Sequence, residues 1–263
     1  MKLLWNTNKN LPETTNLIEE RTIFWGNYHY VNSYPWILNL LSKLEIEIIN
    51  DTQHLDENES IIVVDHMISA KESFYFDLSN KVKKIYLIHL GDEGGAEKKD
   101  LVYSLCEHIW RTFSLPLYRD FKNVTSIPIG YKSGVLNKNK SSRNYKWAFV
   151  GTPHKSSRHD LLFQLSNVEP SFSHKTKKFN EKIMEVDEMS EILSSTIFIP
   201  CPNGFVHPET YRLYEALECE CIPIVENSYK YYDRLFPGNP FIKIYKWQEA
   251  QNIIMTCRLG ADF

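Results

Sequence analysis

Arg212 and Glu215 are the side chains whose types and spacing most directly indicate chemistry. They lie three positions apart in a segment with helical character, so both would lie on one face of a helix. An arginine can hold a diphosphate through several charge-assisted hydrogen bonds, and a carboxylate one turn further along can accept hydrogen bonds from two ribose hydroxyls. The pair is therefore a candidate for binding a nucleotide, although an ordinary surface ion pair has the same spacing.

The surrounding sequence would place this pair at the edge of a sheet. Thr196–Ile199 is an apolar run that predicts a buried strand, which prolines and a glycine end, and Cys221–Val225 predicts the next strand. A helix is expected to begin near Pro208, with Glu209 and Thr210 in its first turn. Both candidate residues would then lie near the carboxyl end of a parallel sheet, where open α/β sheets bind ligands.

A glycine and an arginine earlier in the chain could complete such a site. Gly151 ends the predicted strand Lys146–Val150, and a glycine there lets the backbone turn tightly beside a ligand. Ser156 or Ser157 could then cap a helix whose N-terminus favours phosphate, and Arg158 would add a positive charge. A single arginine more commonly lies at a solvent-exposed position on a helix.

The loop after Thr196–Ile199 supplies further candidates. Asn203 and Gly204 could approach a diphosphate or surround a base, although Asn-Gly is also a frequent turn dipeptide. Tyr211 could stack on the base, but a place in the core is the more usual one for such a tyrosine.

Taken in chain order, these segments resemble the exostosin-type glycosyltransferases. The residues that carry the resemblance in the second half are Trp147–Gly151, Arg158, Arg212, Glu215–Leu217 and Cys221–Ile224. Those in the first half, His89–Glu93, Arg111 and Ile127–Tyr131, resemble the ribitol xylosyltransferase branch. No single motif is diagnostic, but the ordered set extends over most of the chain.

The resemblance implies an α/β protein with two Rossmann-like lobes that face a cleft, which is the GT-B architecture. The second lobe would bind the nucleotide sugar, with Arg158 and Arg212 on its diphosphate and Glu215 on its ribose. Transferases of this kind usually neutralise the leaving diphosphate with arginines and helix dipoles. No Asp-x-Asp, His-x-x-x-His or Cys-x-x-Cys spacing indicates a metal site, so neither a metal nor another cofactor is expected.

Two acidic residues in the first half are candidates for the general base. Asp92 and Glu93 follow the predicted strand Lys84–His89 and precede a pair of glycines. An inverting transfer needs a base that takes the proton of the acceptor hydroxyl as it attacks the anomeric carbon. Either carboxylate could do this, with Glu93 favoured, although an acidic solvated loop would have the same composition.

Acceptor binding in the first lobe has three further candidates. Asp65 and His66 follow the predicted strand Ile61–Val64 and match the position of Asp92 at a strand end, so they are also a second candidate for the base, although a histidine there is more often a structural residue. His29 lies in an aromatic stretch that could stack on sugar rings, although a core and its rim are also rich in aromatic residues.

Predicted strands and helices alternate along the chain, which is typical of a mostly parallel sheet covered by helices. The expected division is an acceptor-side lobe over residues 1–135, a nucleotide-sugar lobe over 145–245, and a C-terminal helix over 246–263 that could cross back to the first lobe. The polar segment Lys132–Asn144 is expected to be the linker.

Composition excludes several classes of protein. A length of 263 residues exceeds the ~100–200 usual for one domain, and the net charge of −3 argues against nucleic-acid binding. No phosphate-binding loop, dinucleotide fingerprint or nucleophile elbow is present, so an ATPase, a dehydrogenase and an esterase are disfavoured. The five cysteines suggest no disulfide framework. No apolar run approaches the ~20 residues needed to cross a bilayer, so the chain is expected to be cytoplasmic, with peripheral membrane association as an option.

The sequence thus predicts a metal-independent glycosyltransferase that moves a sugar from a nucleoside-diphosphate sugar, with UDP favoured, to a carbohydrate acceptor with inversion. A glycan-binding protein that keeps the fold without turnover is the alternative, and another sugar-nucleotide enzyme such as an epimerase is a third possibility.

Overall fold

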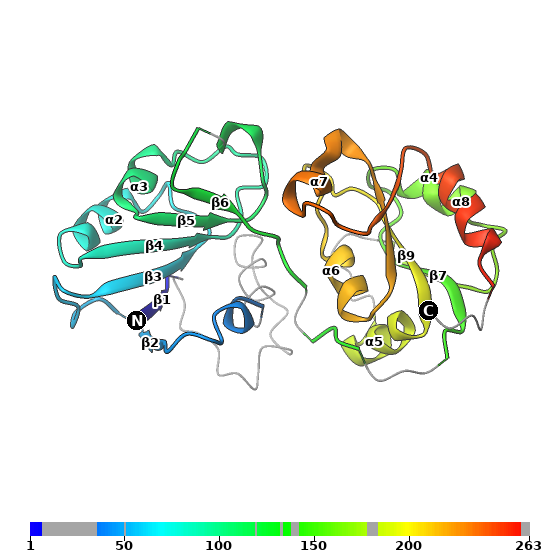
Figure 1. Ribbon diagram of the computed structural model, residues 1–263, viewed down its shortest axis with the longest axis horizontal. Helices are drawn as coiled ribbons and strands as arrows, with labels where there is room; N and C mark the ends of the chain where they lie inside the picture. Colours follow the sequence, from blue (N-terminus) through cyan, green and yellow to red (C-terminus); the bar gives the residue numbers. More distant parts are fainter. Residues whose placement is uncertain are drawn as a thin grey trace. The chain divides into compact units, whose positions relative to one another are not determined.

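Strands and helices alternate along both halves of the chain, and each half builds one parallel sheet (Figure 1). The structure is a computed structural model that describes residues 1–6, 36–49, 51–118, 120–131, 134–137, 142–177 and 184–258. It divides into two compact units, residues 1–129 and 130–263. The predicted class, an α/β protein with two parallel sheets, is confirmed.

The first unit contains a six-stranded sheet in the order β2-β1-β3-β4-β5-β6. The order along the chain reverses beside β1, because β2 lies on one side of it and all later strands lie on the other. Ligands bind at such a switch point in open α/β sheets. The elements are β1 (Lys2–Trp5), β2 (Glu47–Ile49), β3 (Ser60–Asp65), α2 (Glu72–Ser79), β4 (Lys84–His89), α3 (Asp100–Leu105), β5 (His108–Arg111), the 3-10 helix η1 (Pro116–Tyr118) and β6 (Val124–Ser126).

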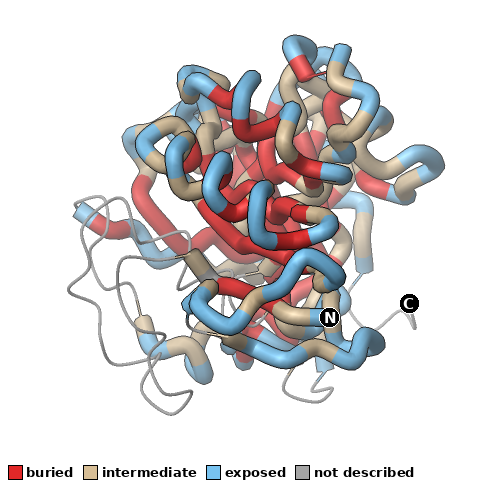
Figure 2. The backbone as a smooth tube through the Cα atoms, turned by 90° about the vertical axis from the view of Figure 1, so that its left-hand side faces the viewer, coloured by how far each residue is buried: buried red, intermediate tan, exposed pale blue. Residues whose placement is uncertain are grey.

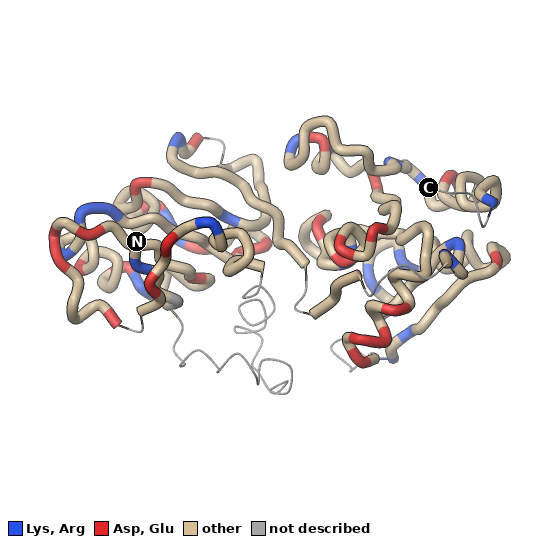
Figure 3. The backbone as a smooth tube through the Cα atoms, turned by 60° about the horizontal axis from the view of Figure 1, so that its bottom comes forward, with Lys and Arg blue, Asp and Glu red and all other residues tan. Residues whose placement is uncertain are grey.

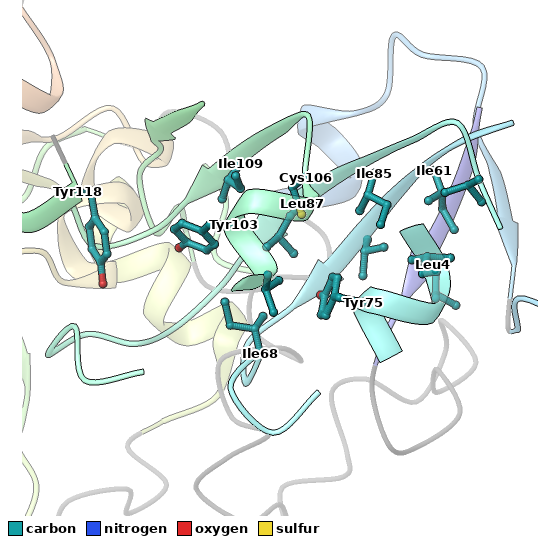
Figure 4. Close-up of a cluster of buried hydrophobic side chains, with 14 residues drawn as sticks. Leu4, Ile61, Ile68, Tyr75, Ile85, Leu87, Tyr103, Cys106, Ile109 and Tyr118 are labelled. Atoms are coloured by element: carbon teal, nitrogen blue, oxygen red, sulfur yellow. The ribbon is translucent and has the colours of Figure 1, made fainter. Parts of the chain in front are cut away.

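Both faces of this sheet are covered, because successive side chains of a strand point to opposite sides. On one face Ile61 and Leu87 pack against Tyr75 of α2 and Tyr103 of α3 (Figure 4). The opposite face packs against the helical residues 36–40. The buried residues of the core between them are Leu3, Ile37, Ile62, Val64, Ile88 and Leu90. The central strands are therefore buried, while many of the connecting loops are exposed (Figure 2).

The second unit repeats this design with a five-stranded sheet in the order β11-β10-β9-β7-β8. Its switch point lies between β7 and β9, since β8 lies on one side of β7 and the later strands lie on the other. The elements are β7 (Tyr145–Gly151), α4 (Arg158–Gln164), β8 (Ser171–Lys175), α5 (Val186–Ser194), β9 (Thr196–Cys201), α6 (Tyr211–Glu218), β10 (Ile222–Glu226), the 3-10 helix η2 (Ser228–Lys230), α7 (Tyr231–Leu235), β11 (Ile242–Ile244) and α8 (Trp247–Thr256).

Helix α8 packs against the sheet of the second unit. Its apolar residues Trp247, Ala250 and Ile254 are buried in the core that also contains Trp147 and Leu161. Helices α4 and α8 lie on one side of the second sheet, and α5 and α6 lie on the other (Figure 1).

Two further features are the distribution of charged residues and the apolar character of the helices. Acidic and basic residues are interspersed along the backbone of both units (Figure 3). Among the described residues, no helix has the length and apolar character that a membrane-spanning segment requires.

Arg143 is a structural residue of the second unit, although it lies in the segment predicted as a linker. Its guanidinium donates hydrogen bonds to the carbonyl oxygens of Ser194 and Thr196 at 2.8 and 2.9 Å, and to those of Cys219 and Glu220 at 3.2 and 2.8 Å. Ser194 is the last residue of α5 and Cys219 directly follows α6, so two of these carbonyls lie at helix C-termini, where they have no partners within their helices. A positive charge is favourable at a helix C-terminus, so one arginine fixes the ends of two helices.

Replacement of this arginine should destabilise the protein. We expect Arg143→Ala to lower the free energy of unfolding by about 2–4 kcal/mol, because several carbonyl oxygens lose a charged donor at once. Urea unfolding measures the change. The exposed Arg258 provides the control, and Arg258→Ala should change stability by less than about 0.5 kcal/mol. Equal effects of the two substitutions would show that the Arg143 contacts contribute nothing specific.

Candidate functional site

The residues predicted to bind a ligand in the second unit gather at the switch point of its sheet. Gly151 is the last residue of β7 and Cys201 is the last residue of β9, and these strands are neighbours. The loops that follow them lead to α4 and α6, which carry Arg158 and Arg212. This is the position at which an open α/β sheet binds its ligand.

Arg212 is fixed on the end of β7. Its Nη2 donates a hydrogen bond to the carbonyl oxygen of Val150 at 2.8 Å, and its Cζ lies 4.8 Å from the centre of the Phe149 ring, within cation–π range. The approach is possible because residue 151 is a glycine with φ +143°, where a Cβ would lie 3.0 Å from Nη2. The guanidinium is thus held in one place at the sheet edge.

Arg158 brings a second positive charge to the same place. Its Nη1 donates to the carbonyl oxygen of Thr152 at 3.0 Å, and its Nε is buried without a hydrogen-bond partner among the described residues. Burial and the nearby charge of Arg212 lower the pKa of Arg158 to about 10, and burial also lowers the pKa of Arg212. Both arginines remain protonated at neutral pH, and their repulsion would be relieved by a bound anion.

Glu215 lies one turn after Arg212 on α6, and only 4% of its surface is exposed. Its charge favours the protonated form of Arg212 and so acts against the effect of burial on the pKa of that arginine. Tyr211 is half-buried at the first position of the helix. The structure therefore places all three residues on one short helix at the sheet edge.

Helix α6 begins at Tyr211, and the prediction that it begins near Pro208 with Glu209 in its first turn is wrong. Glu209 is instead buried in the chain before the helix, where its carboxylate accepts hydrogen bonds from the hydroxyls of Tyr214 and, at 2.7 Å, Tyr231. Burial and the charge of Glu209 raise the pKa of Tyr214 well above its ordinary value. This carboxylate ties the loop to both α6 and α7, which the sequence did not suggest.

Asn203 is held at the start of the same loop. Its backbone N–H donates to Oε2 of Glu226 at 2.8 Å, and its side-chain Nδ2 donates to the hydroxyl of Ser228 at 2.6 Å. Its Oδ1 and the hydroxyl of Thr210 are buried without a hydrogen-bond partner among the described residues. The N–H of Gly204 donates to the carbonyl of Pro208 at 3.4 Å. Asn203 is therefore fixed in the loop between β9 and α6, with an acceptor atom that no described residue uses.

In the first unit Asp65 lies at the carboxyl end of β3, where its buried carboxylate is surrounded by donors. Oδ1 accepts from Nζ of Lys71 at 2.6 Å and from the backbone N–H of His66 at 2.7 Å. Oδ2 accepts from Nδ2 of Asn6 at 2.7 Å and from the hydroxyl of Tyr75 at 3.0 Å. These contacts connect the ends of β1 and β3 across the switch point and give Asp65 a structural role.

Asp92 is likewise enclosed, in the loop that follows β4. Its Oδ2 accepts a hydrogen bond from the hydroxyl of Tyr118 at 2.8 Å and lies 3.7 Å from Nη1 of Arg111. Its Oδ1 accepts the backbone N–H of Glu97 at 3.2 Å. Arg111 is fully buried and stacks on the ring of Tyr118, with Cζ 3.5 Å from the ring centre. The carboxylate of Asp92 is therefore neutralised and fixed.

The other first-unit candidates occupy the same edge of the sheet, except for one that cannot be placed. Glu93 follows Asp92 and is half-buried, as is His66. The loops after β3 and β4 touch, because a Cβ on Gly91 would lie 3.3 Å from the carbonyl oxygen of His66. His29 lies outside the described residues.

The sequence patterns assigned no role in binding or catalysis to Glu97, Glu209 or Glu226. The signal that could have found Glu97 is its place in the polar loop that also carries Asp92 and Glu93, directly after a strand. Within the described parts of the chain, no group of three or more His, Cys, Asp or Glu side chains lies together as metal ligands would.

One family model matches the chain. It is described as the RXYLT1 C-terminal domain and covers residues 118–259, which is more than half of the sequence and includes Gly151, Arg158, Arg212 and Glu215. No curated protein matches the chain by sequence.

Solved structures share the fold at low sequence identity. The Anabaena protein Alr3699/HepE in complex with UDP is 11% identical, with 98% of this chain and 90% of that chain covered and a TM-score of 0.51. An alpha1,3-fucosyltransferase is 13% identical, with 97% of this chain and 76% of that chain covered and a TM-score of 0.50. At these identities the likeness shows that the fold is shared.

The contact between Gly151 and Arg212 can be tested by a matched pair of substitutions. We expect Gly151→Ala to lower the free energy of unfolding by about 1–3 kcal/mol more than Gly238→Ala does. Both glycines have a positive φ, but a Cβ meets Arg212 only at position 151, and it meets nothing within 4 Å at position 238. Thermal or urea unfolding of both variants gives the difference. Equal losses would mean that the backbone, and not the guanidinium, requires the glycine.

Proposed function

The chain belongs to the RXYLT1 C-terminal domain family, and from this membership and the geometry of the second unit we propose that it is a glycosyltransferase that moves a sugar from a UDP-sugar to a carbohydrate acceptor. The resemblance to the ribitol xylosyltransferase branch is confirmed by the family match. The family model includes the four switch-point residues Gly151, Arg158, Arg212 and Glu215.

The observation that carries the proposal is the pair of arginines at the β7/β9 switch point. The guanidinium groups of Arg158 and Arg212 lie near each other in a half-buried position, and Nε of Arg158 is buried without a hydrogen-bond partner among the described residues. Such a pair can bind an anion that has several acceptor oxygens. A diphosphate has this character. Glu215, one turn after Arg212, would accept hydrogen bonds from the ribose hydroxyls of the same nucleotide. UDP is the favoured nucleotide because Alr3699/HepE, which shares the fold, was solved with UDP.

The same residues would serve the chemical step. As the bond between the anomeric carbon and the diphosphate breaks, negative charge grows on the leaving UDP. Arg158 and Arg212 would stabilise this charge because they are already in place and need no reorganisation. We therefore propose transfer without a metal ion, with the acceptor hydroxyl attacking the face opposite to the leaving group so that the configuration inverts. The base for this step would come from the loop after β4, which carries Asp92, Glu93 and Glu97.

A thermal-shift panel of UDP, GDP, CDP and their sugars tests donor binding. UDP at ~100 times its dissociation constant should stabilise the native state by ~2.7 kcal/mol, which raises the melting temperature visibly. In Arg212→Ala the same concentration should stabilise by well under about 1 kcal/mol, because charge-assisted hydrogen bonds worth about 1.5–3 kcal/mol each are lost. Glu215→Ala should weaken UDP binding in the same direction.

Each variant is compared with its own melting temperature without ligand, and Arg258→Ala serves as the control. A full UDP shift in Arg212→Ala would contradict the assignment of the donor site. UDP release from a UDP-sugar, with or without an added glycan, then separates a transferase from the alternative of a glycan-binding protein that has no turnover.

A further inference from the structure

Glu97 bridges two loops at the carboxyl edge of the first sheet. It lies between β4 and α3, and its Oε2 accepts the backbone N–H groups of Ile68 at 2.9 Å and Ser69 at 3.2 Å, both in the loop after β3. Two amide donors on one oxygen fix the plane of the carboxylate. The side chain thus has a single orientation set by backbone atoms of a neighbouring strand's loop.

The second oxygen of Glu97 faces solvent. The side chain is 16% exposed, no hydrogen bond from the described residues reaches Oε1, and this oxygen is not one of the buried atoms that lack a partner, so it is accessible to solvent. A carboxylate with one oxygen anchored and the other accessible can receive a proton from a hydroxyl group without first breaking a protein contact. This is the geometry of a general base.

The two neighbouring aspartates have a different geometry. Both oxygens of Asp65 accept hydrogen bonds, and Lys71 neutralises the charge. Both oxygens of Asp92 are also used, and Arg111 lies 3.7 Å away. Among the described residues, no lysine or arginine forms an ion pair with Glu97. Within the described part of the chain, the one ionisable side chain within ion-pair distance of its carboxylate is His89, whose Nε2 lies 4.0 Å from Oε2, and burial lowers the pKa of that histidine to about 3, so it is neutral.

The electrostatic surroundings also suit a base. Burial raises the pKa of Glu97 above its ordinary value, the amides of Ser69 and Ile68 oppose this, and the charges of Asp92 and Asp65 raise it further. A base is most effective when its pKa lies close to the working pH. The titratable and charged groups on the elements around Glu97 are Asp65, His66, Lys71, His89, Asp92, Glu93, Lys98, Lys99, Asp100, Tyr103, Arg111 and Tyr118.

We propose that Glu97 is the general base of the transfer, with Asp92 as a positioning residue that holds its backbone. Oε1 of Glu97 takes the proton of the acceptor hydroxyl as the hydroxyl oxygen forms its bond to the anomeric carbon of the donor. The bond from that carbon to the diphosphate breaks, and its electron pair leaves with UDP. The inference rests on the proposed function, because it assigns a role within that reaction.

The test compares Glu97→Gln with Glu93→Gln in the full chain. The probe is whichever UDP-sugar releases UDP fastest from a panel of UDP-xylose, UDP-glucose, UDP-galactose, UDP-glucuronic acid and UDP-N-acetylglucosamine, with water as the acceptor. We expect Glu97→Gln to lower kcat by ~100-fold or more with KM for the UDP-sugar and the UDP thermal shift unchanged. Glu93→Gln should lose far less. Glu72→Gln, on the outer helix α2, is the control that keeps the wild-type rate.

The fold should survive in the Glu97 variant. The pKa of Glu97 is raised in the folded state, so the protein loses stability as the pH rises from the unfolded pKa of this carboxyl to its folded pKa. Above the folded pKa the charge of Glu97 lowers the free energy of unfolding, and glutamine removes this cost. Glutamine also keeps a carbonyl oxygen for the amides of Ile68 and Ser69. The melting temperature at pH 7 should therefore not fall.

The wild-type pH profile gives a second measurement that needs no variant. The rate should fall as the pH drops through the pKa of the base, with the midpoint of the acid limb above the ordinary glutamate value of 4.5. A Glu97→Gln enzyme that keeps more than about a tenth of kcat, or a rate that stays constant down to pH 4.5, would overturn the assignment of Glu97 alone. Wild-type protein that releases UDP from none of the sugars would overturn the proposed function, and the inference with it.

Discussion

The hydrogen bond from Arg212 to the carbonyl of Val150 is the interaction on which the second unit's site depends. It holds a guanidinium over the end of β7, it requires a glycine at position 151, and it brings Arg212 near Arg158. The helix that carries Arg212 is in turn fixed at both ends. Glu209 binds Tyr214 and Tyr231 near its start, and Arg143 binds the carbonyls at its end. The site is thus preorganised before any ligand arrives.

In the first unit, the acidic residues differ in how far their charge is compensated by neighbouring groups. Its sheet edge carries acids, and each buried acid must be compensated or must change its protonation. Asp65 and Asp92 are compensated by a cation and a tyrosine hydroxyl each. Glu97 has backbone amides on one oxygen only. The degree of compensation therefore separates acids that build the edge from the acid that could exchange a proton there.

Much of the fold follows from local sequence signals. Long apolar runs such as Thr196–Ile199 and Lys84–His89 predicted strands, and the structure contains them because central parallel strands are buried on both faces. Two strands gave no such signal. His108–Arg111 has four residues with polar ends, and Ser171–Lys175 is a polar edge strand that exposes most of its side chains. Neither carries a hydrophobic period that a sequence pattern could reveal.

The site was predictable where a role depends on residue type and on the nearest strand end. Gly151, Arg158 and Arg212 meet that condition, and the structure brings them together. Glu209 was misplaced in a helix because one of its two partners, Tyr231, lies 22 residues away in the sequence, so the local pattern does not show that the carboxylate is drawn inward. The anchoring of Glu97 by the loop after β3 is equally nonlocal.

Asp92 and Glu97 lie in one loop, but their different contacts suit them to different roles. Asp92 accepts the backbone N–H of Glu97 and is itself held by Tyr118 and Arg111, so it sets where Glu97 lies. The same negative charge raises the pKa of Glu97, and the nearby Arg111 does not abolish this effect. A sequence pattern marks the loop as acidic but cannot assign the roles, because these depend on which carboxylate a buried arginine reaches. Asp92 thus positions the half-buried Glu97 and also raises its pKa, which explains why two acids so close together need not be alternatives for one function.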